Sequence, residues 1–138
     1  MATTTSNRIK TVDIIYSDFL TNLVPHPVFK DVVRYVNEHA VTYSIRNLIL
    51  TDVGERLYSP DVGGGIRSLL FENISNVTAE SISVRVQSLI TKYEPRALAL
   101  NIVVIPYYDN NAYVVTVTYS LINKTESITT NIQLNRVR

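Results

Sequence analysis

The chain has 138 residues, the size of one ordinary domain, and its 46% hydrophobic and 18% charged residues exclude an intrinsically disordered protein. The formal net charge of +1 argues against nucleic acid or an anionic membrane as a partner. The absence of cysteine excludes disulfides, thiolate nucleophiles and cysteine-type zinc sites.

Residues 1–36 are expected to form an extended N-terminal arm. The stretch from Ala2 to Thr11 is small and polar, and it lacks the apolar core of a secretory signal. Pro25-His26-Pro27 interrupts the next segment, because two prolines disfavour a helix there. No apolar run is long enough to span a membrane. We therefore expect an arm with one short strand, on a protein that stays inside the cell that makes it.

The first helix is predicted from Asn37 to Asp52, with Asn37 as its N-cap. Its apolar positions recur at helical spacing and are Val41, Ile45, Leu48 and Ile49. Gly54 ends it. The segment from Gly54 to Ile66 carries a proline and three consecutive glycines, so a loop is expected.

The second helix has the clearer periodicity. Thr78 is the expected N-cap, with Glu80 in the first turn, and the apolar positions are Ile82, Val86, Leu89, Ile90 and Tyr93. Because Pro95 disfavours the helical conformation in the residue before it, Glu94 is the last plausible helical position.

Three strands follow, since the hydrophobic period changes from helical spacing to alternation. They are predicted at 98–104, closed by Pro106, at 113–121 and at 128–134, with a hairpin loop at 109–111. Leu98, Leu100, Ile102 and Val104 are expected on one face. The fold class is therefore α+β: residues 37–138 form a single domain in which two main helices pack on one side of a three-stranded antiparallel sheet.

Few residues indicate catalysis. His26 and His39 have no triad partner or metal-ligand spacing. The run Gly63, Gly64 and Gly65 suggests a phosphate loop, but it lacks the Gly-Lys-Ser/Thr of a P-loop, and close backbone approach is the simpler interpretation. The acidic candidates for a glycosidase pair are Glu55, Asp61, Glu72 and Glu94, and the sequence places no two of them together. We predict no catalytic residue, no metal and no cofactor.

Glu94-Pro95-Arg96 is a more specific feature, because two opposite charges flank a rigid corner between helix and strand. In one account Glu94 and Arg96 pair and brace the corner. In the other, Arg96 is a planar donor fork for the carboxylates or carbonyls of a partner. The second account predicts that Arg96→Ala leaves melting nearly unchanged. The sequence leaves both open.

Three ordered motifs carry a family resemblance: Leu70-Phe71-Glu72-Asn73, Tyr93-Glu94-Pro95-Arg96 and Val103-Val104-Ile105-Pro106-Tyr107-Tyr108-Asp109. With them, the region from Asn47 to Leu134 resembles the lysozyme-like baseplate wedge family of contractile phage tails. Relatives occur in type VI secretion baseplates and R-type tailocins.

This resemblance implies a structural subunit of the virion tail baseplate, assembled in the host cytoplasm, that binds other wedge subunits and initiates the sheath. It associates Glu94, Pro95 and Arg96 with docking on a helical bundle of neighbouring wedge subunits. Tail tube-associated proteins are further candidate partners.

The last strand is the expected contact for the tail sheath protein, by strand addition at an open sheet edge. The residues assigned to it are Ile128, Thr130, Ile132 and Leu134. Two alternatives remain: a peptidoglycan hydrolase of the tail, and a regulatory domain that binds a small anion at Gly63 to Gly65.

Overall fold

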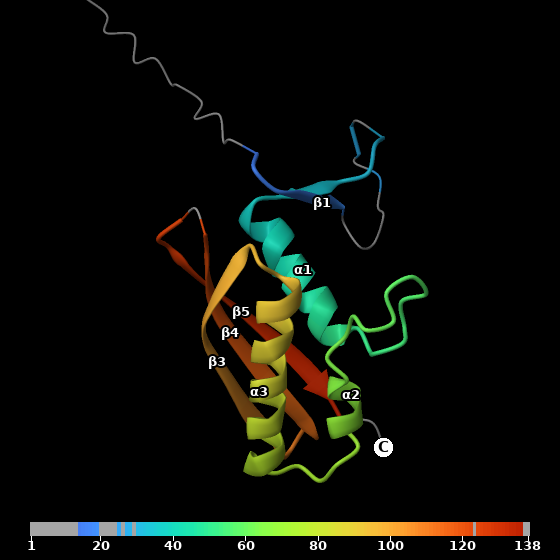
Figure 1. Cartoon of the computed structure of the whole chain (residues 1–138), viewed down its shortest axis with the longest axis vertical. Helices are drawn as coiled ribbons and strands as arrows, with labels where there is room; N and C mark the ends of the chain where they lie inside the picture. Colours follow the sequence, from blue (N-terminus) through green and yellow to red (C-terminus); the bar gives the residue numbers. More distant parts are fainter. Residues whose placement is uncertain (1–13, 20–24, 26, 29, 123, 137–138) are drawn as a thin grey trace, which may run out of the picture.

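The computed structural model describes residues 14–19, 25, 27–28, 30–122 and 124–136 (Figure 1). In chain order the elements are β1 (Ser17–Phe19), β2 (Arg34–Val36), α1 (Glu38–Leu50), α2 (Ile66–Leu69), α3 (Asn76–Tyr93), β3 (Ala97–Tyr107), β4 (Ala112–Leu121) and β5 (Ser127–Asn135). The predicted mixture of helices with a three-stranded antiparallel sheet is confirmed. Among the described residues, no helix is long and apolar enough to cross a membrane.

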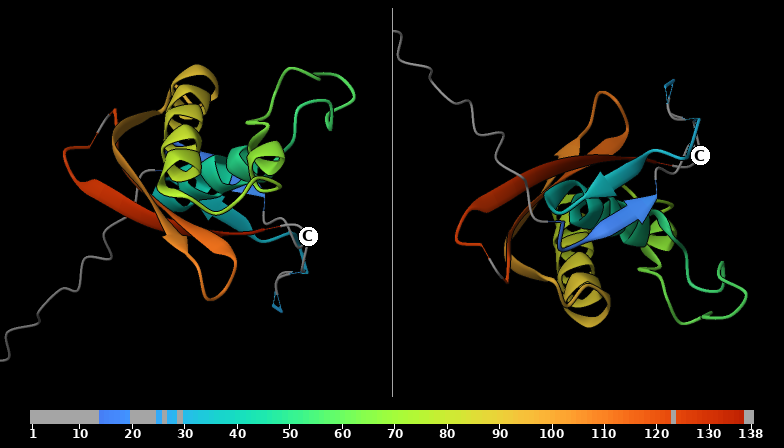
Figure 2. Two further views of the ribbon diagram at one scale, coloured as in Figure 1. Left: turned by 90° about the horizontal axis from the view of Figure 1, so that it is seen from below. Right: turned by 90° about the horizontal axis from the view of Figure 1, so that it is seen from above.

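The sheet has the order β3-β4-β5, with both pairs antiparallel, so β3 and β5 are its edges. Figure 2 shows α1 and α3 on the same side of this sheet. Their apolar faces and the inward residues of β4 form the core, because burying these side chains removes them from water. The largest fully buried side chains include Tyr113, Tyr119, Ile45, Ile82 and Ile90.

Helix α3 begins earlier than the sequence predicts. Ser75 has extended backbone angles, and its hydroxyl accepts a hydrogen bond from the Thr78 backbone nitrogen at 3.1 Å. Thr78 is therefore inside the first turn, where it is buried and donates its hydroxyl to the Asn73 carbonyl at 3.2 Å. The prediction of Thr78 as N-cap is wrong, because the segment offers two hydroxyl side chains and the earlier one takes the role.

Asn37 precedes α1, but its side chain makes no capping hydrogen bond to the helix. Its Oδ1 atom accepts instead from the backbone nitrogens of Ile15 and Tyr16, at 2.8 and 3.2 Å. Asn37 lies at the predicted position before α1, but the prediction that its side chain caps the helix is wrong. An asparagine oxygen accepts from whichever backbone donors the fold brings to it. The helix ends at Leu50, two residues before the predicted position.

Strand β3 differs from the predicted strand in register and in length. A register shift between Ala99 and Asn101 places one extra residue in β3. Such a bulge reverses the faces that follow it. Leu98 and Leu100 are thus exposed on the outer face, while Ile102 and Val104 pack on the core. The expectation that all four share one face is wrong.

Pro106 does not close β3, which continues to Tyr107. Proline is tolerated there because β3 is an edge strand, where a missing N–H can face away from the sheet. The outer face of β3 consequently exposes Ile105 and Tyr107 as well as the two leucines.

The predicted arm lies partly outside the described residues, which include none of residues 1–13 and not His26. Within the described part, β1 pairs with β2 in an antiparallel ladder, from Ser17 opposite Val36 to Phe19 opposite Arg34. Figure 1 shows this ladder beside the N-terminal end of α1. The sequence predicts only one short strand in this region.

Candidate functional site

The corner between α3 and β3 is formed by Glu94, Pro95 and Arg96. Glu94 is the C-cap of α3, and its backbone nitrogen donates to the Ile90 carbonyl at 2.9 Å. Pro95 prevents a further helical turn. The Ala97 nitrogen then donates to the Glu94 carbonyl at 3.2 Å and starts β3. The chain therefore turns sharply within three residues and brings both charged side chains to one place.

Glu94 and Arg96 form a bidentate ion pair. Nε of Arg96 donates to Oε1 of Glu94 at 2.5 Å, and a terminal nitrogen of Arg96 donates to Oε2 at 2.7 Å. The Glu94 side chain is only 2% exposed, whereas that of Arg96 is 32% exposed. A planar guanidinium meets a carboxylate in this fork geometry, which lysine cannot reproduce. The bracing arrangement considered for this corner is the one observed.

The electrostatics of the pair favour two charged groups. Burial alone raises the pKa of the Glu94 carboxyl, but hydrogen bonds from Arg96 and Ser44 and the positive charge of Arg96 lower it below its ordinary value. The hydrogen bond to Glu94 correspondingly raises the pKa of the Arg96 guanidinium. Because Ser44 belongs to α1, the buried carboxylate links the corner at the end of α3 to α1.

Tyr16 and Asp18 complete the surroundings of Arg96, and the sequence did not indicate either of them. The centre of the Arg96 guanidinium lies 5.5 Å from the centroid of the Tyr16 ring, which is within the range of a cation–π contact. Asp18 acts on Arg96 through its charge. Among the described residues, the other terminal nitrogen of Arg96 makes no hydrogen bond, so the guanidinium keeps donors for a partner.

The geometry does not support the expectation that Arg96→Ala leaves melting unchanged. Removing the guanidinium leaves the buried Glu94 carboxylate without its counter-charge, and an unpaired buried charge is strongly destabilising. Arg96 therefore stabilises the fold, and a test of its role in docking needs a substitution that keeps the charge.

The second candidate site is the open edge of β5. No strand pairs with that edge within the described part of the chain. The Arg136 nitrogen donates to the Asn111 carbonyl at 2.8 Å, just beyond the ladder that pairs Ala112 with Asn135. Hydrogen-bonded and non-bonded pairs alternate along an antiparallel ladder. The outward N–H groups of β5 thus belong to Ser127, Thr129, Asn131, Gln133 and Asn135.

The residues assigned to partner binding on this strand lie on its inner face. Ile132 and Leu134 are buried in the core, Ile128 packs against it and Thr130 is half-buried. By the same alternation, their backbone N–H groups bond to β4. An added strand would therefore meet the alternate residues, whose exposed side chains are polar.

The two edges of the sheet differ in how open they are. Edge β3 has a bulge and Pro106, and the Ser83 hydroxyl donates a hydrogen bond to its Ile102 carbonyl at 3.2 Å. These features hinder pairing with another strand. The nine residues of β5 carry no proline and no register shift. Edge β5 is therefore the better template for strand addition.

A hollow of about 290 Å³ lies beside the C-terminal end of β5. It is lined by the end of α1, by α2 and by β5, through Ile49, Leu50, Asp52, Ile66, Arg67, Leu70, Gln133, Leu134 and Asn135. Most of these side chains are apolar. The hollow has room for a side chain of a strand that pairs with β5.

The glycine run packs the loop onto the end of α1. A Cβ atom on Gly63 would lie 2.6 Å from the Asp52 carbonyl carbon, and φ of Gly63 is +150°. The Gly64 nitrogen donates to the Thr51 carbonyl at 3.3 Å, and the Gly65 carbonyl accepts from Arg85 at 2.9 Å. An anion cradle uses backbone N–H groups, and the Gly64 N–H is already bonded to the end of α1.

Of the four carboxylates considered for hydrolysis, one is buried in an ion pair and three are exposed. Glu55, Asp61 and Glu72 are exposed, and Glu94 is buried against Arg96. His39 is an exposed residue tilted against Tyr35. No cluster of three or more potential metal ligands occurs among the described residues.

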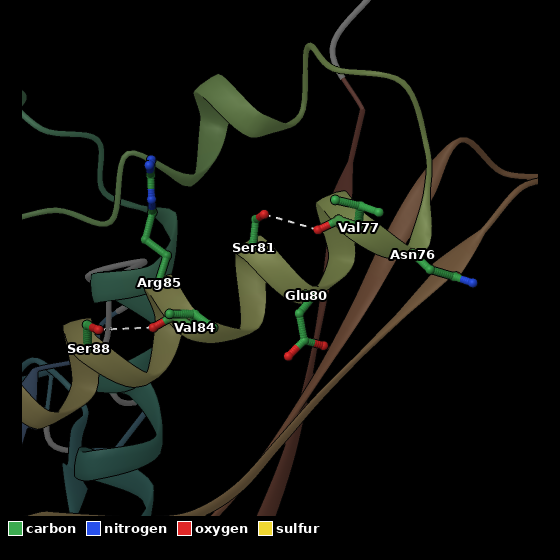
Figure 3. Close-up of a pocket in the computed structure, with 7 residues that line it drawn as sticks. All are labelled: Asn76, Val77, Glu80, Ser81, Val84, Arg85 and Ser88. Atoms are coloured by element: carbon green, nitrogen blue, oxygen red, sulfur yellow. Dashed lines mark hydrogen bonds between the residues drawn. The ribbon is translucent and has the colours of Figure 1, made fainter.

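An open groove also runs along the exposed face of α3, lined by Asn76, Val77, Glu80, Ser81, Val84, Arg85 and Ser88 (Figure 3). The hydroxyls of Ser81 and Ser88 donate to the carbonyls of Val77 and Val84 in the same helix. They are therefore already bonded, and the groove offers mainly the apolar surface of the two valines.

Comparisons with known proteins agree on one family. The family model described as baseplate wedge protein gp25 matches residues 36–126. Baseplate wedge protein gp25 of Enterobacteria phage T4 is 32% identical over 99 residues, which cover 72% of this chain and 75% of that protein.

Three solved structures share the fold. A protein of Geobacter sulfurreducens described as a candidate tail lysozyme has a TM-score of 0.70 at 23% identity, covering 77% of this chain and 96% of its own. A chain of the anti-feeding prophage baseplate has a TM-score of 0.61 at 22% identity, covering 89% and 87%. A chain of the type VI secretion baseplate complex has a TM-score of 0.56 at 13% identity, covering 69% and 91%.

Proposed function

This chain belongs to the baseplate wedge protein gp25 family, and from that premise we propose that it joins neighbouring wedge subunits to the tail sheath. It is a structural component of the baseplate of a contractile tail. In the proposal, the Glu94–Arg96 corner docks on other wedge subunits, and the open edge of β5 accepts a strand of the sheath protein.

The observation that carries the sheath contact is the open edge of β5. Thr129, Asn131 and Gln133 direct backbone donors away from the sheet, and their polar side chains keep this edge compatible with water before assembly. Main-chain hydrogen bonds supply affinity in strand addition, and pockets for alternate side chains supply specificity. The hollow beside Leu134 provides such a pocket.

The wedge contact rests on the geometry of Arg96. Its guanidinium is held by two bonds to Glu94, yet it is one-third exposed and retains unused donors. A side chain already fixed in place loses little conformational entropy on binding. Arginine in such a setting is a frequent contributor to the energy of protein interfaces. Tail tube-associated proteins are additional proposed partners.

The two proposed contacts can be placed along the chain. In the proposal, residues 37–138 are the wedge domain, which contains α1, α3 and the sheet, and residues 1–36 are its N-terminal arm. The two proposed contacts lie at separate places in this domain: the corner at the end of α3, and the free edge of β5.

We propose that the chain is not a peptidoglycan hydrolase. A glycosidase needs a carboxylic acid whose pKa is raised, so that it can donate a proton near neutral pH. Glu94 is the buried carboxyl among the candidates, and its pKa is lowered by Arg96 and Ser44. The fold likeness to a candidate tail lysozyme does not transfer a reaction.

Electron cryomicroscopy of the assembled baseplate and sheath tests this function directly. We expect density for a strand of the sheath protein hydrogen-bonded along residues 127–135, and a neighbouring wedge subunit against Arg96. Density that places another element of the baseplate on the β5 edge would overturn the sheath contact.

A further inference from the structure

The backbone of Asn37 has an unusual conformation, with φ of 50° and ψ of −115°. This region favours glycine, because a Cβ atom meets steric resistance there. A residue with a side chain persists in such a conformation only when its surroundings hold it. The asparagine side chain must therefore supply contacts that glycine could not.

Those contacts hold the backbone at Tyr16. The Asn37 backbone nitrogen donates to the Tyr16 carbonyl at 2.7 Å, and Oδ1 of Asn37 accepts from the nitrogens of Ile15 and Tyr16 at 2.8 and 3.2 Å. The Asn37 carbonyl accepts from Val41 at 3.2 Å and so belongs to the first turn of α1. One residue thereby fixes the segment before β1 to the start of the helix.

The contacts continue from Tyr16 to the corner. The Tyr16 side chain is half-buried against the core, and its ring lies 5.5 Å from the Arg96 guanidinium. Arg96 is also bonded to Glu94, which is linked to Ser44 of α1. The guanidinium therefore contacts both a buried carboxylate and an aromatic ring.

We propose that the segment 15–18 and the Glu94–Arg96 corner form one docking surface, and that Asn37 is the positioning residue that holds the two parts together. The proposal rests on the proposed function, since it describes how the wedge contact is built. Asn37 acts through Tyr16 and does not touch the partner.

Charge on this surface indicates what the partner presents. Glu94 is paired with the guanidinium of Arg96, and the negative charge of Asp18 also acts on it. Another carboxylate would be repelled by the negative charges of Asp18 and Glu94, and Glu94 already neutralises the guanidinium. The acceptors that fit are uncharged carbonyl oxygens of a neighbouring wedge subunit, with the Tyr16 ring as the adjoining apolar contact.

The test uses the full chain and four variants, with the affinity for purified neighbouring wedge subunits and thermal unfolding as readouts. Asn37→Gly removes the carboxamide while suiting the backbone conformation. Asn37→Asp keeps an oxygen acceptor. Tyr16→Leu keeps an apolar side chain but removes the ring. Arg96→Lys keeps the charge but removes the fork. Hydrogen exchange of the Ile15 and Tyr16 amides reports on their hydrogen bonds to the Asn37 side chain.

We expect Asn37→Gly to unfold near the wild-type temperature and to exchange its Ile15 and Tyr16 amides faster. It should bind neighbouring wedge subunits at least about tenfold more weakly, which is the effect of losing one hydrogen bond between the partner and the charged Arg96. Asn37→Asp should restore slow exchange and most of the affinity. Tyr16→Leu should weaken binding to a similar extent, and it carries the test if Asn37→Gly does not fold.

The inference fails if Arg96→Lys weakens binding but folded Asn37→Gly and Tyr16→Leu bind like the wild type. A different result would overturn the docking role of the corner itself: wild-type affinity in folded Arg96→Lys. The two failures are thus distinguishable.

Discussion

The guanidinium of Arg96 holds the carboxylate of Glu94, two residues earlier in the chain, through two hydrogen bonds of 2.5 and 2.7 Å. Pro95 between them makes this close pairing possible, because it turns the chain out of α3. The pair has two consequences, one for stability and one for docking, and they require different substitutions.

For stability, we expect Arg96→Ala to lower the free energy of unfolding at pH 7 by about 2 to 4 kcal/mol, because it leaves a buried carboxylate unpaired. Arg96→Lys should cost less than half as much, since a positive charge remains beside Glu94. Urea denaturation of the purified chain measures both. Equal stability of Arg96→Ala and the wild type would show that solvent reaches Glu94.

The pH dependence of stability follows from the same carboxyl. The folded-state pKa of Glu94 is lowered, so its stabilising contribution is present above the unfolded value of about 4.3 and is lost as pH falls through the folded pKa. Unfolding curves of the wild type and Glu94→Gln should therefore differ at pH 7 and converge as the pH falls below the folded-state pKa of Glu94. A constant difference across this range would contradict the assigned ion pair.

For the sheath contact, Asn131→Pro should yield baseplates and tubes without an extended sheath. Proline removes the outward N–H of residue 131, while the ladder bonds from Thr130 and Ile132 to β4 remain. Asn131→Ala is the matched control, because it keeps the N–H and should assemble a normal sheath. Negative-stain electron microscopy measures sheath length, and circular dichroism verifies the fold. Full-length sheaths on folded Asn131→Pro would rule out strand addition at this position.

The purified chain should not clear a suspension of peptidoglycan. The reason is that Glu72 is exposed and Glu94 is ionised by its pairing with Arg96, so neither is a poised acid. Turbidity assays with a known lysozyme as positive control check this. Clearing that disappears in Glu72→Gln or Glu94→Gln would assign a hydrolase activity to the chain.

Local sequence was sufficient where neighbouring residues decide the structure. Apolar spacing predicted the boundaries of α1 and α3 to within two residues, except at the N-terminus of α3, where Ser75 is the cap instead of Thr78. The alternation of apolar residues, together with turn residues, predicted β4 and β5. Pro95 predicted the end of α3 because its ring acts on the residue directly before it. The three motifs, including the corner, were sufficient to indicate the family that the comparisons show.

Contacts between distant residues had to come from the tertiary structure. The bulge in β3 turns Leu98 and Leu100 outward, because register is chosen by pairing with β4 and not by the alternation of β3 alone. The Oδ1 atom of Asn37 binds Ile15 and Tyr16, more than twenty positions away, although the same atom could have capped its own helix. Sequence spacing identifies the groups that need partners, but only the folded chain brings those partners within hydrogen-bonding distance.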